Sequence, residues 1–314
     1  MAFTLNQRSY SAGKYGLELD HTMAGWLKEV DGGHAVGDVV EEKMGSDHLT
    51  KKHLGNLQYE AISIKCGAGM SKGLYEWIKT GFDQSSHPRG RENGAVLFAD
   101  YDKKEIARLT FQHAMMEEFT MPALDASSKD AALMTIKFKP ETAKKEKGKG
   151  SPIENKISAA AQKKWLPSNF ILEMGGFDCS RVSKIEALTI KQKIILDSIG
   201  SKREYELVAA NVSVPNLEIT ISEAFADQFY DWHQTFVIDG KCDEIDEKTA
   251  TLYYMAPDMK QKLFALNFFN LGVFKIAPEK VEAGAESVRR IKVSMYCEDI
   301  KFEYTNSEAL YGTR

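Results

Sequence analysis

Short stretches in which apolar and polar residues alternate run along most of this chain. Each is bounded by Gly, Pro, Asn or Asp, as short antiparallel strands are. In chain order these stretches are 60–66, 95–98, 107–111, 134–138, 217–221, 251–254, 264–268 and 291–295. The pattern predicts a mainly β protein.

Only two segments have clear helical periodicity, 71–80 and 222–236. In each, apolar residues recur at helical spacing around a tryptophan, Trp77 in the first and Trp232 in the second. Each segment begins with a serine whose hydroxyl can cap the first helical turn. We expect both tryptophans to anchor their helices in the core.

The two halves repeat the same order of features: strand, helix, hairpin, proline loop and closing strand. The two helix tryptophans lie 155 positions apart, whereas Ile64 of the preceding strand lies 157 positions from Ile221. These spacings place two extra residues in the first copy, within residues 66–70. Later strands match in the same order, such as 109–111 with 266–268. We therefore predict a tandem duplication.

A Lys-rich segment, residues 141–167, lies between the copies. Eight lysines fall within residues 139–164. We expect a solvated linker between a first domain, 1–140, and a second domain, 168–314. A basic strip that faces an acidic partner surface is the alternative.

The composition is that of an ordinary globular protein, with 43% hydrophobic and 27% charged residues. No stretch approaches the ~18 apolar residues of a membrane helix, and no secretory signal is evident, so we expect synthesis in the cytoplasm without stable membrane contact. The four cysteines lie far apart and are expected to be reduced. Residues 1–157 carry no net charge and residues 158–314 carry −4, so neither half suggests a nucleic-acid surface.

One segment, Gly69-Met70-Ser71-Lys72-Gly73, reads G-x-S-x-G between a predicted strand and a helix, which is the context of a hydrolase nucleophile elbow. That fold needs strands that alternate with helices around a parallel sheet, whereas here strand follows strand. We interpret Ser71 as a helix cap and keep a serine hydrolase as the alternative from a different class.

Histidines and carboxylates form no convincing site in the sequence. Asp47, His48 and His53 share a polar loop, but no Cys or third His lies near them and their spacing fits no zinc template. Glu117 and Glu118 are paired only in sequence. We predict no catalytic residue, no metal, no cofactor and no small-molecule substrate. A soluble β-barrel that binds a small ligand is a weaker alternative.

Several segments of the first copy match a known family: Leu17–Leu19, Gly25–Val30, Tyr59–Lys65, Glu76-Trp77, Asp100–Lys104 and Pro122–Asp130. Through them the first copy resembles the tube proteins of contractile phage tails and related contractile injection systems. The second copy resembles them more weakly, through Trp232 and Pro278. The resemblance spans about residues 3–140 and 168–306.

The resemblance implies two tandem antiparallel β-sandwich or half-barrel domains, each with a flanking α-helix, in a structural protein without enzymatic activity. Single-domain family members form hexameric rings that stack, so two domains per chain imply a homotrimer that forms a pseudo-hexameric ring around a central channel. Its partners would be stacked copies of itself and tail sheath or baseplate hub proteins, within a phage tail or injection-system particle. Nucleic acid or protein would pass only as cargo in transit.

The resemblance also gives a role to two polar loops, residues 45–55 and 200–206. They fall where family members carry the segment that reaches the adjoining ring. The residues expected to contact the adjoining ring are Asp47, His48, Lys51, Lys52, His53, Lys202, Arg203, Glu204 and Glu206.

The tandem form leaves the place of the ring open. One option is a repeating layer of the tube. The other is a single tube-initiator or adaptor ring that joins a six-fold tube to a trimeric baseplate hub. A trimer of unlike halves suits such a junction, and the unequal charge of the two halves agrees with it.

Overall fold

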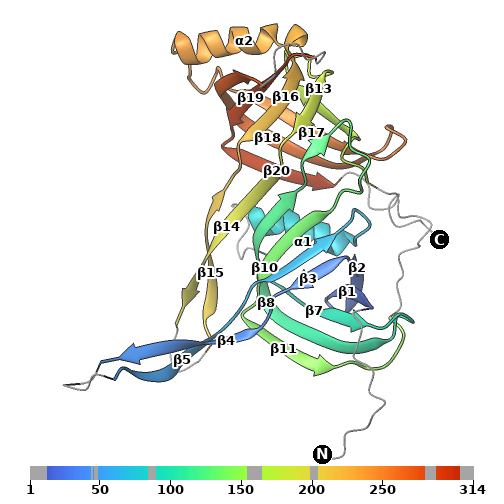
Figure 1. The fold of residues 1–314 in the computed structure, drawn as a ribbon, viewed down its shortest axis with the longest axis vertical. Coiled ribbons are helices and arrows are strands. Elements are labelled where there is room, and N and C mark those ends of the chain that lie inside the picture. Colours follow the sequence, from blue (N-terminus) through green and yellow to red (C-terminus); the bar gives the residue numbers. More distant parts are fainter. Residues whose placement is uncertain are drawn as a thin grey trace, which may run out of the picture.

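The computed structural model describes residues 13–43, 45, 49–83, 90–153, 165–198, 204–279 and 288–304. Strands dominate these residues, and neighbouring strands of each sheet run antiparallel. They form two β units that lie end to end, the first below and the second above in Figure 1. The predicted mainly β fold with tandem antiparallel domains is confirmed.

The first unit folds around one long strand, β8, which pairs with β7 and β11 along its first half and with β10 along its second. Its strand order is β2-β1-β7-β8-β10-β6-β3, so the sheet curls toward a barrel. The elements are β1 (Lys14–Leu19), β2 (Thr22–Leu27), β3 (Glu29–Asp31), β4 (Ala35–Glu42), β5 (Lys51–Tyr59), β6 (Ile62–Cys66), α1 (Lys72–Phe82), β7 (Glu92–Ala99), β8 (Glu105–Met121), β9 (Leu124–Asp125), β10 (Met134–Lys139) and β11 (Thr142–Lys147).

The second unit has the same plan, with the strand order β12-β17-β18-β19-β16-β13 and with β20 on β18. Its helix, α2, lies at the far end of the molecule (Figure 1). The elements are β12 (Phe170–Met174), β13 (Val182–Ile185), β14 (Leu188–Asp197), β15 (Glu206–Ser213), β16 (Leu217–Ser222), a 3-10 turn (Glu223–Phe225), α2 (Asp227–His233), a π-helical turn (Gln234–Ile238), β17 (Lys248–Met255), β18 (Lys262–Pro278), β19 (Arg290–Tyr296) and β20 (Asp299–Tyr304).

Strand β18 repeats β8 residue for residue. Both strands have 17 residues, and their residue numbers differ by 157 throughout. Both have a bulge at the same place, where the pairing register skips Glu117 in β8 and Phe274 in β18. Strands β11 and β20 also differ by 157. The tandem repeat predicted from the sequence is therefore confirmed in the strand pairing.

One detail of the predicted repeat is wrong. Ile64 pairs with Ile136, and Ile219 pairs with Val293. Because β10 and β19 differ by 157, Ile64 corresponds to Ile219 and not to Ile221. The residue numbers of corresponding positions then differ by 155 both in this strand and in the helix that follows it, so the first copy has no extra residues between the strand and the helix. Alternating isoleucines hid this slip, because a shift of two residues keeps the same face inside.

Both predicted helices are present, but they begin differently. The hydroxyl of Ser71 accepts a hydrogen bond from the N–H of Leu74 at 3.4 Å, which is the predicted cap of α1. Ser222 makes no side-chain capping bond, and α2 begins only at Asp227, after a 3-10 turn. Trp77 and Trp232 are both buried.

Part of the predicted linker is a strand. Residues Thr142–Lys147 form β11, which pairs with the first half of β8. The sequence of this strand is rich in lysine and lacks the alternating apolar residues that would predict a strand. Lysine is tolerated here because its apolar stem can lie along a sheet while its charge stays in water. Residues 154–164 of that segment lie outside the described residues. No helix among the described residues is long and apolar enough to cross a membrane.

Candidate functional site

The two units meet along a contact, here called the internal seam. The first unit contributes α1, β9, the second half of β8, and Arg91 and Glu141, which precede β7 and β11. The second unit contributes β13, β14, β15 and β20. We take it as the candidate functional site because it joins two copies of one fold through a defined surface. In Figure 1 the β14–β15 hairpin leaves the second unit and runs down the side of the first.

Strand β14 extends the sheet of the first unit. Leu188 to Lys191 pair antiparallel with Met121 to Glu118, so an edge of β8 that would otherwise be open is covered. The hydroxyls of Thr120 and Thr189 lie 3.0 Å apart across this pair. At its end, Lys191 Nζ lies 3.7 Å from Glu118 Oε2.

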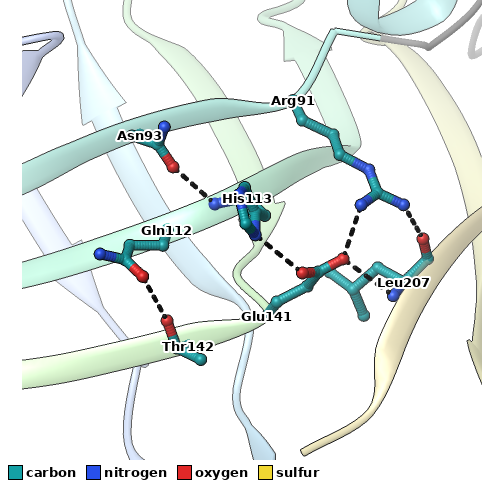
Figure 2. Close-up of polar contacts among 7 residues, drawn as sticks. All are labelled: Arg91, Asn93, Gln112, His113, Glu141, Thr142 and Leu207. Atoms are coloured by element: carbon teal, nitrogen blue, oxygen red, sulfur yellow. Dashed lines mark hydrogen bonds and ion pairs between the residues drawn. The ribbon is translucent and has the colours of Figure 1, made fainter. Parts of the chain in front are cut away.

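A charged cluster joins β15 to the first unit (Figure 2). The Arg91 guanidinium donates to Glu141 Oε1 at 2.8 Å and to the carbonyl oxygen of Leu207 at 2.6 Å. The N–H of Leu207 donates to the same Glu141 oxygen at 3.2 Å. His113 Nδ1 lies 3.0 Å from the other carboxylate oxygen. Because the side chain of Glu141 is only 12% exposed, these donors are needed to compensate for its desolvation.

Helix α1 contributes the apolar part of the seam. Tyr75 is 1% exposed and packs against Phe264, Phe302 and Tyr304 of the second unit, with ring centroids 5.2, 6.1 and 5.9 Å away. The neighbouring Glu76 accepts a hydrogen bond from the Tyr304 hydroxyl at 2.9 Å. Partial burial, together with this carboxylate, raises the pKa of Tyr304. A third strand pair, β9 with β13, completes the seam.

Five of the residues predicted to contact an adjoining ring are described, and they lie on two hairpins. Lys51, Lys52 and His53 are exposed on β5, so the segment predicted as a loop is largely strand. Lys52 pairs with Glu41 across the β4–β5 hairpin. Glu204 bridges to Leu57, and Glu206 begins β15, so the second hairpin rests on the first. Asp47, His48, Lys202 and Arg203 lie outside the described residues.

A further charged cluster among the described residues lies on the first unit, on its β1–β7–β8 face. Arg108 bonds Glu105 at 2.7 Å and Glu18 at 3.4 Å. The hydrogen bond to Glu105, followed by the nearby negative charges, raises the pKa of Arg108. Both carboxylates bond the single guanidinium, so the cluster fixes the packing of β1 against β8. The described residues contain no group of three His, Cys, Asp or Glu side chains that could hold a metal ion.

The seam residues Tyr75, Arg91 and Glu141 are not among the residues predicted from the sequence to make contacts. A signal for one of them was present, because Tyr75-Glu76-Trp77 returns as Tyr230-Asp231-Trp232. The repeated tryptophan is explained by the core of each unit. The repeated tyrosine needs another partner. For Tyr75 of the first unit, that partner is the second unit.

Comparison with known proteins gives one family match. Residues 11–144 match the family model of the T4-like virus tail tube protein gp19. This range runs from just before β1 into β11 and so covers the first unit. No curated protein matches the chain.

Three solved structures are similar to parts of this chain at low identity. The tube-terminating cap of the anti-feeding prophage is 15% identical, with a TM-score of 0.39, over 47% of this chain and 97% of its own. A chain of the PVC sheath–tube complex, from an extracellular contractile injection system, is 16% identical, with a TM-score of 0.39, over 46% of this chain and 94% of its own. Hcp1 from Flavobacterium johnsoniae is 18% identical, with a TM-score of 0.24, over 45% of this chain and 99% of its own.

The family match lies on the segments that carried the resemblance in the sequence, from Leu17 to Asp130, and on a unit whose strand order the second half of the chain repeats. The first β unit of this chain, residues 11–144, therefore matches the tail tube protein family of T4-like viruses, which confirms that resemblance.

Proposed function

We propose that this chain is a structural, non-enzymatic component of the inner tube of a contractile tail or injection system, in which three chains form a pseudo-hexameric ring around a channel. The observation that carries the proposal is the internal seam. It joins two tube-like units by strand addition, so one chain already contains one of the unit-to-unit contacts that a ring repeats. The family match of the first unit supports the choice of particle. The domain division at residues 1–140 and 168–314 belongs to this proposal.

The test is native mass spectrometry and electron microscopy of the purified chain and of the particle that contains it. We expect trimers and rings with six similar lobes, or the chain as part of the particle. A chain that is monomeric at every concentration and absent from every particle would overturn the proposal.

The end of the β4–β5 hairpin supports a contact with a next ring. This hairpin projects from the molecule (Figure 1). Its apolar residues Val39 and Leu54 are 60% and 69% exposed. A projecting hairpin with exposed apolar side chains gains stability when another surface covers it. We therefore assign the contact with an adjoining ring to this hairpin and its charged residues Lys51 and Lys52, together with Glu204 and Glu206 of the second hairpin.

A second candidate is a single adaptor ring between the tube and a trimeric baseplate hub. It is favoured by the unlike hairpins of the two units: β4–β5 projects, whereas β14–β15 lies along the first unit. A ring of three such chains presents three projecting hairpins, which match a three-fold partner. Labelling the chain in isolated particles separates the candidates, because a tube layer is labelled along the whole tube and an adaptor ring only at one end.

A serine hydrolase is the candidate from another class. The Ser71 hydroxyl already accepts the capping hydrogen bond of α1. We expect Ser71→Ala to lower stability by about 0.5–2 kcal/mol. A hydrolase would instead lose a measurable esterase activity with the same substitution.

A further inference from the structure

We propose that a second copy of this chain covers the end of the second unit, through a chain-to-chain seam in which Tyr230 and Asp231 of α2 dock on Lys145 and Lys147 of the copy's β11. This inference rests on the proposed ring and names the contact that would close it. In the same contact, the β18 edge at residues 275–277 adds the start of the copy's β4, residues 34–36.

The repeat gives each residue of the internal seam a counterpart. The long strands and the strands β11 and β20 differ by 157 residue numbers. The residue numbers of the β4–β5 and β14–β15 hairpins differ by 155. The bulges show this alignment, since they follow Gly37 in β4 and Gln192 in β14. The helices also differ by 155, as Trp77 and Trp232 show. The second unit therefore carries the counterpart of the docking helix, and the first unit carries the counterpart of the surface that receives it.

Side chains that are buried in the internal seam have counterparts that are more exposed, on the second unit and on β4. Tyr75 on α1 is 1% exposed inside the internal seam, whereas its counterpart on α2, Tyr230, is 40% exposed. On the strand edge, Phe119 is buried under β14, whereas its counterpart Ile276 is only partly buried. Ala35 is exposed on β4, although its counterpart Ile190 is buried. A partner that repeats the internal seam would bury all three.

The chemistry of the two surfaces is complementary. In the internal seam Glu76 accepts a hydrogen bond from Tyr304. The counterparts are Asp231 and Lys147, both exposed and without an ion-pair partner among the described residues. Their superposition on the internal seam places a carboxylate against an ammonium group, so the contact remains charge-assisted.

The expected partner of Tyr230 also differs from the partner of Tyr75. Tyr75 packs on Phe302, whose counterpart is Lys145. Lys145 Nζ lies 5.8 Å from the centroid of the Phe98 ring. Tyr230 would therefore meet a half-buried aromatic ring with a lysine beside it, which suits a cation–π contact. This arrangement gives the Lys-rich strand β11 an acidic and aromatic partner.

The strand edge fits as well. In the internal seam Glu118 lies opposite Lys191. Their counterparts, Lys275 and Val36, place no like charges together. Thr120 and Thr189 are replaced by Ala277 and His34, which fit as a small and a large side chain.

The contact is head-to-tail, because each chain offers one docking surface and one receiving surface, and such a contact closes into a ring when its rotation allows it.

Disulfide trapping tests the register in the full-length chain. Ala35→Cys and Ile276→Cys are combined in a Cys242→Ser background, which removes the exposed cysteine. Directly opposite residues have Cβ atoms about 4.5–5.5 Å apart, so mild oxidation should link chains to one another. The control combines Ala35→Cys with Lys301→Cys, which lies on β20 away from the proposed edge, and should not link chains.

Charge reversal tests the helix contact. Asp231→Lys or Lys147→Asp alone should weaken trimer assembly by about fivefold or more at low salt, whereas the two together should restore it. Glu244→Lys, on the exposed loop after α2, is the matched control and should have no effect.

The outcomes separate the two proposals. Rings that form without the specific cross-link, and without loss in the single charge variants, overturn this seam and leave the proposed function standing. A chain that stays monomeric and is absent from every particle overturns both. Cross-linking at the predicted pair, together with rescue by the charge swap, supports the seam.

Discussion

The buried carboxylate of Glu141 holds the two units together at the level of single atoms. Three donors surround it: Arg91, the N–H of Leu207 and the ring of His113. Arg91 in turn bonds the Leu207 carbonyl, so one ion pair satisfies both backbone groups of a residue in the other unit. A cluster of this kind fixes position, because a shift of β15 would leave several polar groups unpaired at once.

We expect Glu141→Ala to lower the free energy of unfolding by about 2 kcal/mol, because Arg91 and the Leu207 N–H lose a charged acceptor. Glu146→Ala, on the adjoining strand β11, is the control, since Glu146 lies nearer the surface, where it pairs with the exposed Lys144 and bonds Thr110. Denaturant titration of both variants checks the difference. Equal losses would mean that the buried cluster adds nothing beyond an ordinary surface pair.

Burial of Cys66 predicts a loss of stability in alkali. Desolvation raises the pKa of Cys66 to about 12, above the value near 8.5 expected for an unfolded thiol. A raised pKa in the folded state contributes stability that is fully present below about pH 8.5 and is lost as the pH rises toward 12. We therefore expect the denaturation midpoint to fall above pH 9 and to fall less steeply in Cys66→Ala. An unchanged pH dependence in that variant would assign the effect to other groups.

At the scale of elements, the two helices show how far a repeat can diverge while it keeps its core. Trp77 Nε1 donates to the Gly90 carbonyl at 2.9 Å, whereas Trp232 Nε1 has no hydrogen-bond partner among the described residues. Both rings fill the same place between helix and sheet. The second helix has kept the volume of the tryptophan and lost its polar contact.

Replacement of either tryptophan with alanine should cost about 3–5 kcal/mol of stability, because each leaves a large cavity. Replacement with phenylalanine should separate them. Trp77→Phe should cost about 1 kcal/mol more than Trp232→Phe, since only the first loses a hydrogen bond. Thermal or denaturant unfolding of the four variants measures this, and a larger cost for Trp232→Phe would contradict the assigned contacts.

The sequence predicted elements well where one face is buried and poorly where burial comes from a distant partner. The β6 and β10 strands alternate strictly because one face of each lies in the core. The sequence pattern predicts a polar loop at 200–206 but not the strands β14 and β15 beside it, because β14 pairs with the distant β8 and β15 carries few buried side chains. Arg91 and Glu141 gave no local signal, because their roles depend on a strand more than 60 residues away.

At the scale of the whole molecule, we proposed that the projecting β4–β5 hairpin contacts an adjoining ring. We expect reversal of charge at Lys51, Lys52 and Arg203 to leave rings intact and to weaken their stacking, because charges of both signs fix the register between surfaces. Reversal of Lys79 on α1 is the control. Electron microscopy that finds normal stacks of the triple variant at physiological salt would rule out this contact.

The covalent bond between the two units has a consequence for counting. A ring made of separate subunits can close with five, six or seven members, and only the angle between neighbours selects among them. In the proposed ring each intact chain brings two units, so a closed ring contains an even number of units, and rings of five or seven units are excluded. The number of units in such a ring can change only by two at a time, because an error in ring size would require a whole chain to be gained or lost.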